Sequence, residues 1–230
     1  MNDSFVNFFS ELFSLLFPKL CLGCHKELKG VNKCLCFACE LRLPQSFEDG
    51  LGVSKAMSSL ELPIPLKHAF SLYFFEKNNL VEKLLYHLKY MGNRQVGVFF
   101  GRKMASLIAK SGCHYDGIIG VPLHVKRKRK RGFNQVDIIG QSVEKVLGIP
   151  YHGSLLRRIK NTPALSKRKG DRKQIVDKAF KLSAPESLLP GHYLLLDDIF
   201  TSGTTLEACG KTLLTQKAIR LSIATVAYRN

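Results

Sequence analysis

The chain contains 230 residues, of which 45% are hydrophobic and 23% are charged, and this composition excludes a fibrous or intrinsically disordered protein. Its 35 Lys and Arg residues outnumber 18 Asp and Glu, and the net charge of +17 predicts an anionic partner such as a polyphosphate, a nucleic acid or an acidic membrane surface. An odd number of cysteines, seven, argues against a disulfide framework, so we expect a reduced, cytoplasmic protein without a membrane span.

The first 18 residues predict an amphipathic helix. Their apolar side chains recur at helical spacing, and the segment ends at Pro18, which cannot continue a helix. We expect the apolar stripe to pack on the rest of the protein, with a partner or membrane surface as the alternative. The stripe consists of Phe5, Phe8, Phe9, Leu12 and Leu16.

Residues 19–45 contain a pattern typical of a zinc ribbon. Two Cys-x-x-Cys pairs follow each other here, Cys21 with Cys24 and Cys36 with Cys39. Four thiolates complete the tetrahedral shell of Zn²⁺ and leave no open position, so the predicted zinc is structural. Cys34 is a fifth candidate that could replace Cys36. Free thiols or a redox pair are the alternatives to a metal site.

Strand and helix patterns alternate through residues 67–230, after a predicted linker over residues 46–66 that is rich in Pro, Gly and Ser. Strands separated by helices predict a parallel sheet covered on both faces. The expected fold is therefore an α/β domain preceded by a small cysteine module. We expect strands at residues 69–75, 115–122, 193–197 and 219–227. We expect helices at residues 80–90, 96–109, 134–147 and 204–215.

An acidic pair ends the apolar strand of residues 193–197. Ligands bind to parallel sheets beyond the carboxyl ends of the strands, and Asp197 and Asp198 come at that end. Adjacent carboxylates repel each other, so their burial is costly unless a diol donates hydrogen bonds to them or a divalent cation lies near. The two aspartates are therefore candidate catalytic residues.

Hydroxyl-bearing residues follow the acidic pair and open the next predicted helix. Backbone N–H groups at a helix start, together with hydroxyl side chains, bind anions without a lysine, and Gly203 allows the backbone to approach a phosphate closely. The alternative is a capped helix that follows a core strand. The segment consists of Thr201, Ser202, Gly203, Thr204 and Thr205.

A run of six cations, Lys126–Arg131, follows a predicted strand and precedes a predicted helix. Such a run is most often solvated, or contacts nucleic acid without reading its sequence. We expect a loop here, over the same sheet edge as the acidic pair, where it could neutralise a pyrophosphate. The candidate pyrophosphate-binding residues are Val121, Pro122, Arg127, Arg129 and Arg131.

Two segments of the sequence resemble known families. The strand, the Asp-Asp pair and the Thr-Ser-Gly-Thr-Thr turn of residues 194–205 resemble the signature with which type I phosphoribosyltransferases bind phosphoribosyl pyrophosphate (PRPP). The basic run, with Arg131, Gly132, Phe133, Asn134 and Gln135, resembles the ComF family, also called GntX-like. Members of this family have the phosphoribosyltransferase fold and are linked to DNA uptake in bacterial competence.

These resemblances imply a type I phosphoribosyltransferase-like parallel sheet and roles for the candidate residues. Asp197 and Asp198 would hold the ribose hydroxyls of PRPP, and residues 201–205 would cradle its 5-phosphate. Mg²⁺ would bridge the ribose hydroxyls and the pyrophosphate, so a dedicated protein cage for this ion is not required. Residues 132–135 would lie near this site.

Three functions are consistent with the sequence. The first is a magnesium-dependent glycosyltransferase that acts in natural transformation, moves a phosphoribosyl group from PRPP to an unknown acceptor and releases pyrophosphate. The second is a nucleic-acid-binding factor whose partner is single-stranded DNA or a DNA-uptake helicase, although Phe133 is the only ring in the basic run, which argues against base stacking. The third is a PRPP-sensing accessory factor without turnover.

Overall fold

The computed structural model contains two compact units, Met1–Leu43 and Pro44–Asn230. The predicted amphipathic helix and most of the predicted linker lie outside the residues that the structure describes. The described residues are 18–28, 34–46, 62–159, 179–183 and 188–229.

The first unit is small and is organised around its cysteines. It contains a short helix, α2 (Phe37–Leu41), and an isolated antiparallel bridge between Leu20 and Glu27. The amide of Leu22 donates to the carbonyl of Cys34 at 3.0 Å and ties the two cysteine-bearing segments together. So small an apolar core needs a further source of stability. Among the described residues of this unit, the buried apolar side chains are Cys21, Leu28, Cys34, Leu35, Cys39 and Leu43.

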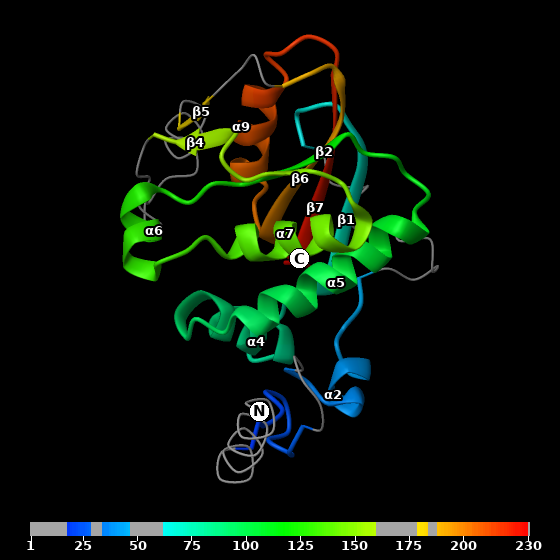
Figure 1. Ribbon diagram of the computed structural model, residues 1–230, viewed down its shortest axis with the longest axis vertical. Helices are drawn as coiled ribbons and strands as arrows, with labels where there is room; N and C mark the ends of the chain where they lie inside the picture. Colours follow the sequence, from blue (N-terminus) through cyan, green and yellow to red (C-terminus); the bar gives the residue numbers. More distant parts are fainter. Residues whose placement is uncertain (1–17, 29–33, 47–61, 160–178, 184–187, 230) are drawn as a thin grey trace, which may run out of the picture. The chain divides into compact units, whose positions relative to one another are not determined.

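The second unit is built on a five-stranded parallel sheet with the strand order β1-β7-β6-β2-β3 (Figure 1). The central strand, β6, buries three consecutive leucines, 194–196, as a strand covered on both faces requires. The parallel sheet confirms the predicted α/β fold. The strands are β1 (Leu66–Phe74), β2 (Gly117–Gly120), β3 (Tyr151–His152), β6 (Gly191–Phe200) and β7 (Ile219–Tyr228).

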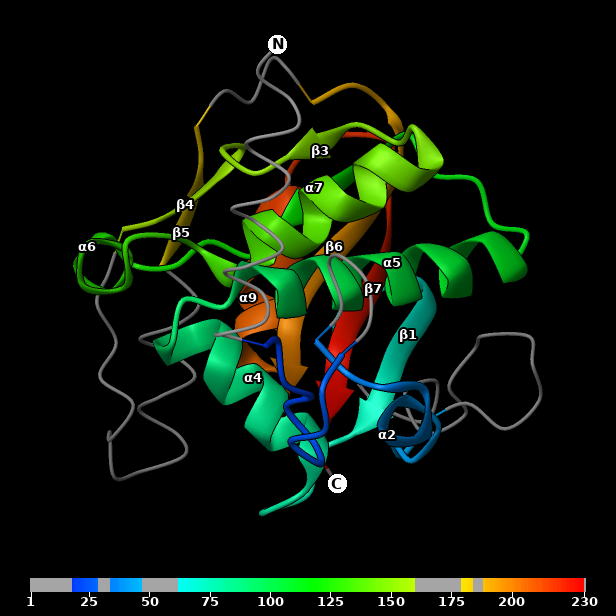
Figure 2. The same cartoon turned by 60° about the horizontal axis from the view of Figure 1, so that its bottom comes forward.

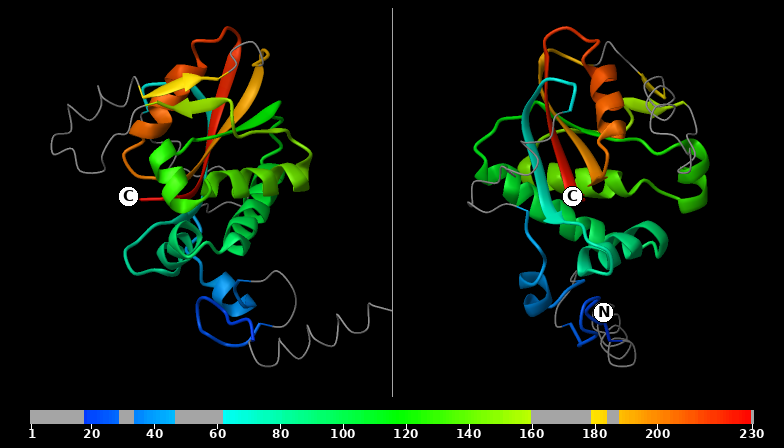
Figure 3. Two further views of the ribbon diagram at one scale, coloured as in Figure 1. Left: turned by 60° about the vertical axis from the view of Figure 1, so that its left-hand side comes forward. Right: turned by 180° about the vertical axis from the view of Figure 1, so that it is seen from behind.

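Helices cover both faces of this sheet. α5 and α7 lie across one face with α4 beside α5 (Figure 2), whereas α9 packs on the other face (Figure 3). Successive side chains of β6 point to opposite faces, and Leu195 belongs to the core on the α9 side with Leu206. Within the described part of the chain, no helix combines the length and apolarity that a membrane crossing requires. The helices are α4 (Leu80–Tyr90), α5 (Arg94–Lys110), α7 (Gln135–Leu147) and α9 (Thr204–Leu213).

Each edge of the sheet is short or partly paired. β3, at one edge, is two residues long. At the other edge, the amide of Ser46 donates to the carbonyl of Leu72 at 3.1 Å, and the amide of Phe74 donates to the carbonyl of Pro44 at 2.8 Å. The segment around residue 45 therefore pairs with part of β1.

The basic run is helical, and the prediction of a loop was wrong. Val125–Arg131 forms α6, because Lys and Arg are good helix formers and both ends of the run are capped. His124 accepts a hydrogen bond from the amide of Lys126 at the start. Gly132 ends the helix with a φ of 83°, a left-handed conformation that glycine adopts without steric cost.

The sequence patterns also missed three short strands, of which β3 has only two residues, and the true length of β6. β4 (Leu156–Arg158) and β5 (Phe180–Leu182) form a separate antiparallel pair. Each has three residues, which is too few for an alternating pattern to be recognised. β6 continues to Phe200 rather than ending at residue 197, because its ladder with β7 runs through both aspartates.

α5 and α7 approach each other closely at Gly101. A Cβ atom at this position would lie 2.4 Å from the Cβ of Ser142 and 2.7 Å from the carbonyl oxygen of Ile139. Both distances are too short for van der Waals contact, and the second involves backbone. A side chain at position 101 would therefore force the two helices apart.

We expect Gly101→Ala to lower the free energy of unfolding by about 1–3 kcal/mol, because overpacking outweighs the gain of about 1 kcal/mol in helix propensity. Urea denaturation followed by circular dichroism measures this change. Ser106→Ala, at an exposed position of α5, should change the stability by less than about 0.5 kcal/mol. Equal stability of the two variants would contradict the close contact between the helices.

Candidate functional site

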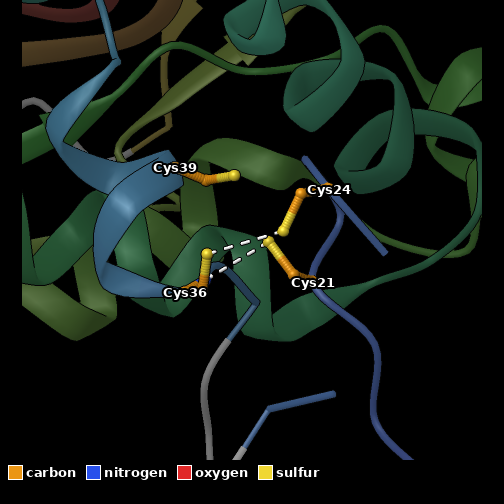
Figure 4. A group of neighbouring side chains, drawn as sticks. All are labelled: Cys21, Cys24, Cys36 and Cys39. Atoms are coloured by element: carbon orange, nitrogen blue, oxygen red, sulfur yellow. Dashed lines mark hydrogen bonds between the residues drawn. The ribbon is translucent and has the colours of Figure 1, made fainter. Parts of the chain in front are cut away.

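The four predicted zinc ligands come together in the first unit. The Sγ atoms of the four residues all lie within 4.8 Å of one another (Figure 4). All four are free thiols, and the Sγ atoms of Cys24 and Cys36 are 3.6 Å apart. A tetrahedral Zn²⁺ with Zn–S bonds of about 2.3 Å separates its sulfur ligands by about 3.8 Å, so this cluster fits zinc. The cluster consists of Cys21, Cys24, Cys36 and Cys39.

Backbone amides favour the thiolate form of Cys21. The amides of Cys36 and Gly23 donate to its Sγ at 3.3 and 3.4 Å. Burial opposes ionisation, but these amides and that of Cys24 lower the pKa of the Cys21 thiol to about 6. The thiolate is the form that binds a metal ion.

Cys34 is not part of this group of converging sulfur atoms. Its side chain is buried, and burial raises the pKa of its thiol to about 12. Of the two alternatives that the spacing left open, the geometry therefore favours Cys36 as the ligand.

The second candidate site lies at the rim of the sheet, by which we mean the carboxyl ends of β2 and β6. The parallel pairing of these strands continues beyond β2, where the amide of Val121 donates to the carbonyl of Leu196 at 2.9 Å. Val121 and Pro122 are buried and therefore lie beside the start of the acidic pair. The structure thus brings together two segments that are more than 70 residues apart in the sequence.

Asp197 and Asp198 face opposite sides of the sheet, because successive residues of a strand alternate. Asp198 is 4% exposed, and its Oδ2 accepts hydrogen bonds from Lys89 Nζ of α4 at 2.8 Å and from Gln135 Nε2 of α7. Asp197 has Arg158 of β4 among its charged neighbours. We expected the two carboxylates to grip one ligand together, but the strand geometry presents Asp197 alone to the α9 side.

The carboxyl group of Asp197 is strongly perturbed. Burial and the neighbouring charge of Asp198 raise its pKa to about 8, while Lys89 and Arg158 oppose this rise. The residue is half-buried, so a ligand at the rim could reach it. Carboxyl groups with pKa values shifted this far are more frequent at functional sites than elsewhere.

The turn after β6 is open to solvent. Thr201 and Ser202 are exposed, and the Oγ of Ser202 lies 3.0 Å from the Oγ1 of Thr204. Gly203 has a φ of 67° and begins α9 without a side-chain cap, so the first amides of α9 can serve an anion. A Cβ at Gly203 would lie 2.5 Å from Leu62 Cδ2, and glycine is therefore required by packing as well as by conformation.

The segment from Arg131 to Gln135 ties α6 and α7 to the rim. Asn134 caps the start of α7, and its Nδ2 donates to the carbonyl of Val121 at 3.1 Å. Gln135 accepts a hydrogen bond from the guanidinium of Arg131 and donates one to Asp198. The side chains of Arg131, Asn134 and Gln135 are therefore each held by a residue outside their own helix.

The cations of α6 do not act as one group. Arg127 and Arg131 are one helical turn apart and share a face, whereas Arg129 lies on the other side of the helix. Arg127 is near the half-buried Arg158, whose pKa is lowered by its partial burial and by the charge of Arg127. Arg131 is half-buried through its contact with Gln135, while Arg129 is exposed. The structure therefore connects two of the three predicted arginines to the rim.

Two residues of the rim were not predicted from the sequence. Lys89 stands beside Leu85 and Leu88, which belong to the buried face of α4, and its side chain is 19% exposed. A lysine at the border of an apolar stripe is a signal that could have been recognised. Arg158 lies in a three-residue strand and carries no such signal.

The chain is similar in sequence to two competence proteins over most of its length. No family model matches the sequence. The chain is 28% identical to Competence protein F of Haemophilus influenzae over 84% of its length, and the match covers 83% of that protein. It is 25% identical to Competence protein ComFC of Bacillus subtilis, over 85% of this chain and 78% of the relative. The chain is ComF-like.

A further relative and two solved structures share shorter or weaker similarity with this ComF-like chain. DNA utilization protein YhgH of Salmonella typhi is 32% identical over 47% of each chain, so the chain matches about half of that protein. Adenine phosphoribosyltransferase from Leishmania tarentolae aligns with 69% of this chain and 91% of its own, with a TM-score of 0.42 and 11% identity. The allosteric regulatory enzyme of purine biosynthesis aligns with 56% of this chain and 26% of its own, with a TM-score of 0.38 and 17% identity.

We expect the ComF-like protein to hold one Zn²⁺ per chain and Cys36→Ser to lose it, because three thiolates bind zinc far less tightly than four. Inductively coupled plasma mass spectrometry of the purified proteins measures the zinc content. Cys34→Ser is the matched control and should retain the metal. Loss of zinc from Cys34→Ser, with Cys36→Ser unchanged, would reverse the assignment of the ligand.

Proposed function

We propose that this ComF-like protein binds PRPP together with Mg²⁺ and acts, as a member of the phosphoribosyltransferase family, in DNA uptake. The main support is the arrangement at the rim, where a half-buried carboxylate, a solvent-open hydroxyl turn and cations of α6 are close to one another. The names of its relatives, two competence proteins and a DNA utilization protein, favour the biological role.

Each part of the rim suits one part of PRPP. The amides that begin α9 and the hydroxyls of Thr201 and Ser202 would bind the 5-phosphate. Asp197 would accept hydrogen bonds from a ribose hydroxyl on the α9 side. Arg127 and Arg158 would stabilise the negative charge that develops on the departing pyrophosphate. Mg²⁺ that arrives with PRPP would neutralise further charge on its phosphate groups without a dedicated protein ligand.

The raised pKa of Asp197 gives the proposal a defined pH dependence. A carboxylate anion accepts a stronger, charge-assisted hydrogen bond from a hydroxyl group than the neutral acid does, and Asp197 loses its proton only as the pH approaches its raised pKa of about 8. The affinity for PRPP should therefore increase from pH 6 to pH 9. A carboxyl with an ordinary pKa would already be ionised over this whole range.

We expect isothermal titration calorimetry at pH 9, where Asp197 is ionised, to show PRPP binding in the presence of Mg²⁺, and Asp197→Asn to weaken it at least about tenfold, because a charge-assisted hydrogen bond is lost. Asp116→Asn removes the same charge at the opposite end of the sheet, next to the start of β6, and should bind as the wild type does. Equal heats for Asp197→Asn and wild type would refute the assignment of this site.

Turnover is a separate question from binding, because a PRPP sensor would have the same site. Release of pyrophosphate during incubation with PRPP, Mg²⁺ and candidate acceptors would identify an enzyme. PRPP binding without release for every acceptor would favour the sensor.

A second candidate function, binding of single-stranded nucleic acid, is favoured by an aromatic pair that the sequence did not place near the cations. Tyr86 and Tyr90, on α4, are 53% and 67% exposed, and their ring centroids are 5.2 Å apart. The guanidinium of Arg131, at the end of α6, lies 5.4 Å from the centroid of Tyr90. Exposed rings beside cations are what a base-stacking surface requires, so the objection drawn from Phe133 no longer applies.

We expect the double variant Tyr86→Ala/Tyr90→Ala to bind a fluorescent oligo-dT at least about fivefold more weakly, since stacking contributes about 1–3 kcal/mol per base. Fluorescence anisotropy at several salt concentrations measures both the affinity and its salt dependence. The slope against salt should stay unchanged, because the phosphate contacts of α6 remain. Leu189→Ala, at an exposed apolar residue before β6, is the control. Unchanged affinity of the tyrosine variant would exclude stacking at this surface.

A further inference from the structure

A continuous polar network ties Asp198 to three helices. Its Oδ2 accepts hydrogen bonds from Lys89 Nζ at 2.8 Å and from Gln135 Nε2, and Gln135 in turn accepts one from Arg131. These partners come from α4, α7 and α6 respectively. Because both donors reach the same oxygen atom, the orientation of the carboxylate is fixed from two directions.

The centre of the network is buried, which makes the contacts of Asp198 energetically important. Asp198 and Gln135 are each 4% exposed. A buried carboxylate without partners is costly, and the loss of one partner from a buried pair leaves an uncompensated charge. The preceding residue, Asp197, carries a second carboxyl group, so the local need for positive charge is larger than for an isolated aspartate.

We propose that Lys89 and Gln135 are positioning residues of the rim, which hold the Asp198 carboxylate in one orientation and allow two adjacent carboxylates to remain there together. Neither residue needs to touch a ligand for this purpose. The consequence for PRPP binding rests on the function proposed above, whereas the consequence for Asp197 does not.

The effect on Asp197 follows from the charges around it. Asp198 on β6 raises the pKa of Asp197, and Lys89 on α4 and Arg158 on β4 lower it, while Cys209 faces it from α9 with a thiol whose own pKa is raised by burial. Removal of the Lys89 charge leaves the charge of Asp198 uncompensated. The pKa of Asp197 should then rise further, so that this carboxyl becomes an anion only at a higher pH.

The first experiment uses the protein without ligand. In protein labelled with ¹³C at the aspartate carboxyl carbons, Asp197→Asn identifies the signal of Asp197, and a pH titration gives its midpoint. We expect Lys89→Met to raise this midpoint by about one pH unit and Lys89→Arg to restore it, because the charge is retained. Lys110→Met removes the same charge from the last, exposed turn of α5 and should leave the midpoint unchanged. If Lys89→Met does not fold, Lys89→Gln provides the same loss of charge.

The second experiment measures PRPP binding with Mg²⁺ by calorimetry from pH 6 to pH 9. We expect Lys89→Met to bind about tenfold more weakly at pH 7 and its affinity to recover at higher pH, while Lys89→Arg stays close to wild type. Gln135→Leu should weaken binding at every pH without moving the pH midpoint, since it removes a neutral donor. A general structural defect would lower the affinity of Lys89→Met equally at all pH values.

The outcomes separate this proposal from the proposed function. An unchanged midpoint of Asp197 in the neutral Lys89 variant would overturn the positioning role, whether or not PRPP binds. If the midpoint rises in the neutral Lys89 variant but the wild-type protein does not bind PRPP, the positioning role is supported and the proposed ligand is refuted. A raised midpoint together with the pH-dependent loss of PRPP affinity would support both.

Discussion

The parallel pairing of β2 with β6 is the constraint on which the rest of the rim depends. The hydrogen bond from the Val121 amide to the Leu196 carbonyl carries this pairing to the last residue before the acidic pair. The chain that leaves β2 enters α6, and the chain that leaves β6 enters α9, so one ladder fixes where both helices begin. The cations of α6 and the first amides of α9 are therefore placed at the same edge of the sheet as the two carboxylates. The two helices do not have to contact each other for this.

The sequence predicted those features that repeat along the chain and missed those that do not. The leucines of residues 194–196 form an apolar run that identifies a central strand, and the stripe of α4 gives its bounds from Leu80 to Tyr90. The Cys-x-x-Cys spacing likewise selects four thiols that meet in space. Periodicity and spacing are local properties, and a single sequence is sufficient to read them.

The contacts that decide the chemistry of the rim are not local. Lys89 meets Asp198 across 109 positions of sequence, and no pattern within α4 states which carboxylate its lysine will reach. The opposite orientation of the two aspartates was also missed, because we ended the strand at residue 197, whereas the ladder with β7 continues to Phe200. In α6 the propensity of Lys and Arg outweighed the repulsion expected within a run of like charges.

The small number of unpaired backbone groups at the edges of the sheet affects how copies of this chain can associate. An unprotected edge strand is a template on which a second molecule can extend the sheet, and this is a common route to aggregation. Here one border is a two-residue strand, and the segment around Gln45 pairs with the last residues, 72–74, of the other. Continuation of the five-stranded sheet from one copy into the next is therefore less favourable than it would be at two long, unpaired edges.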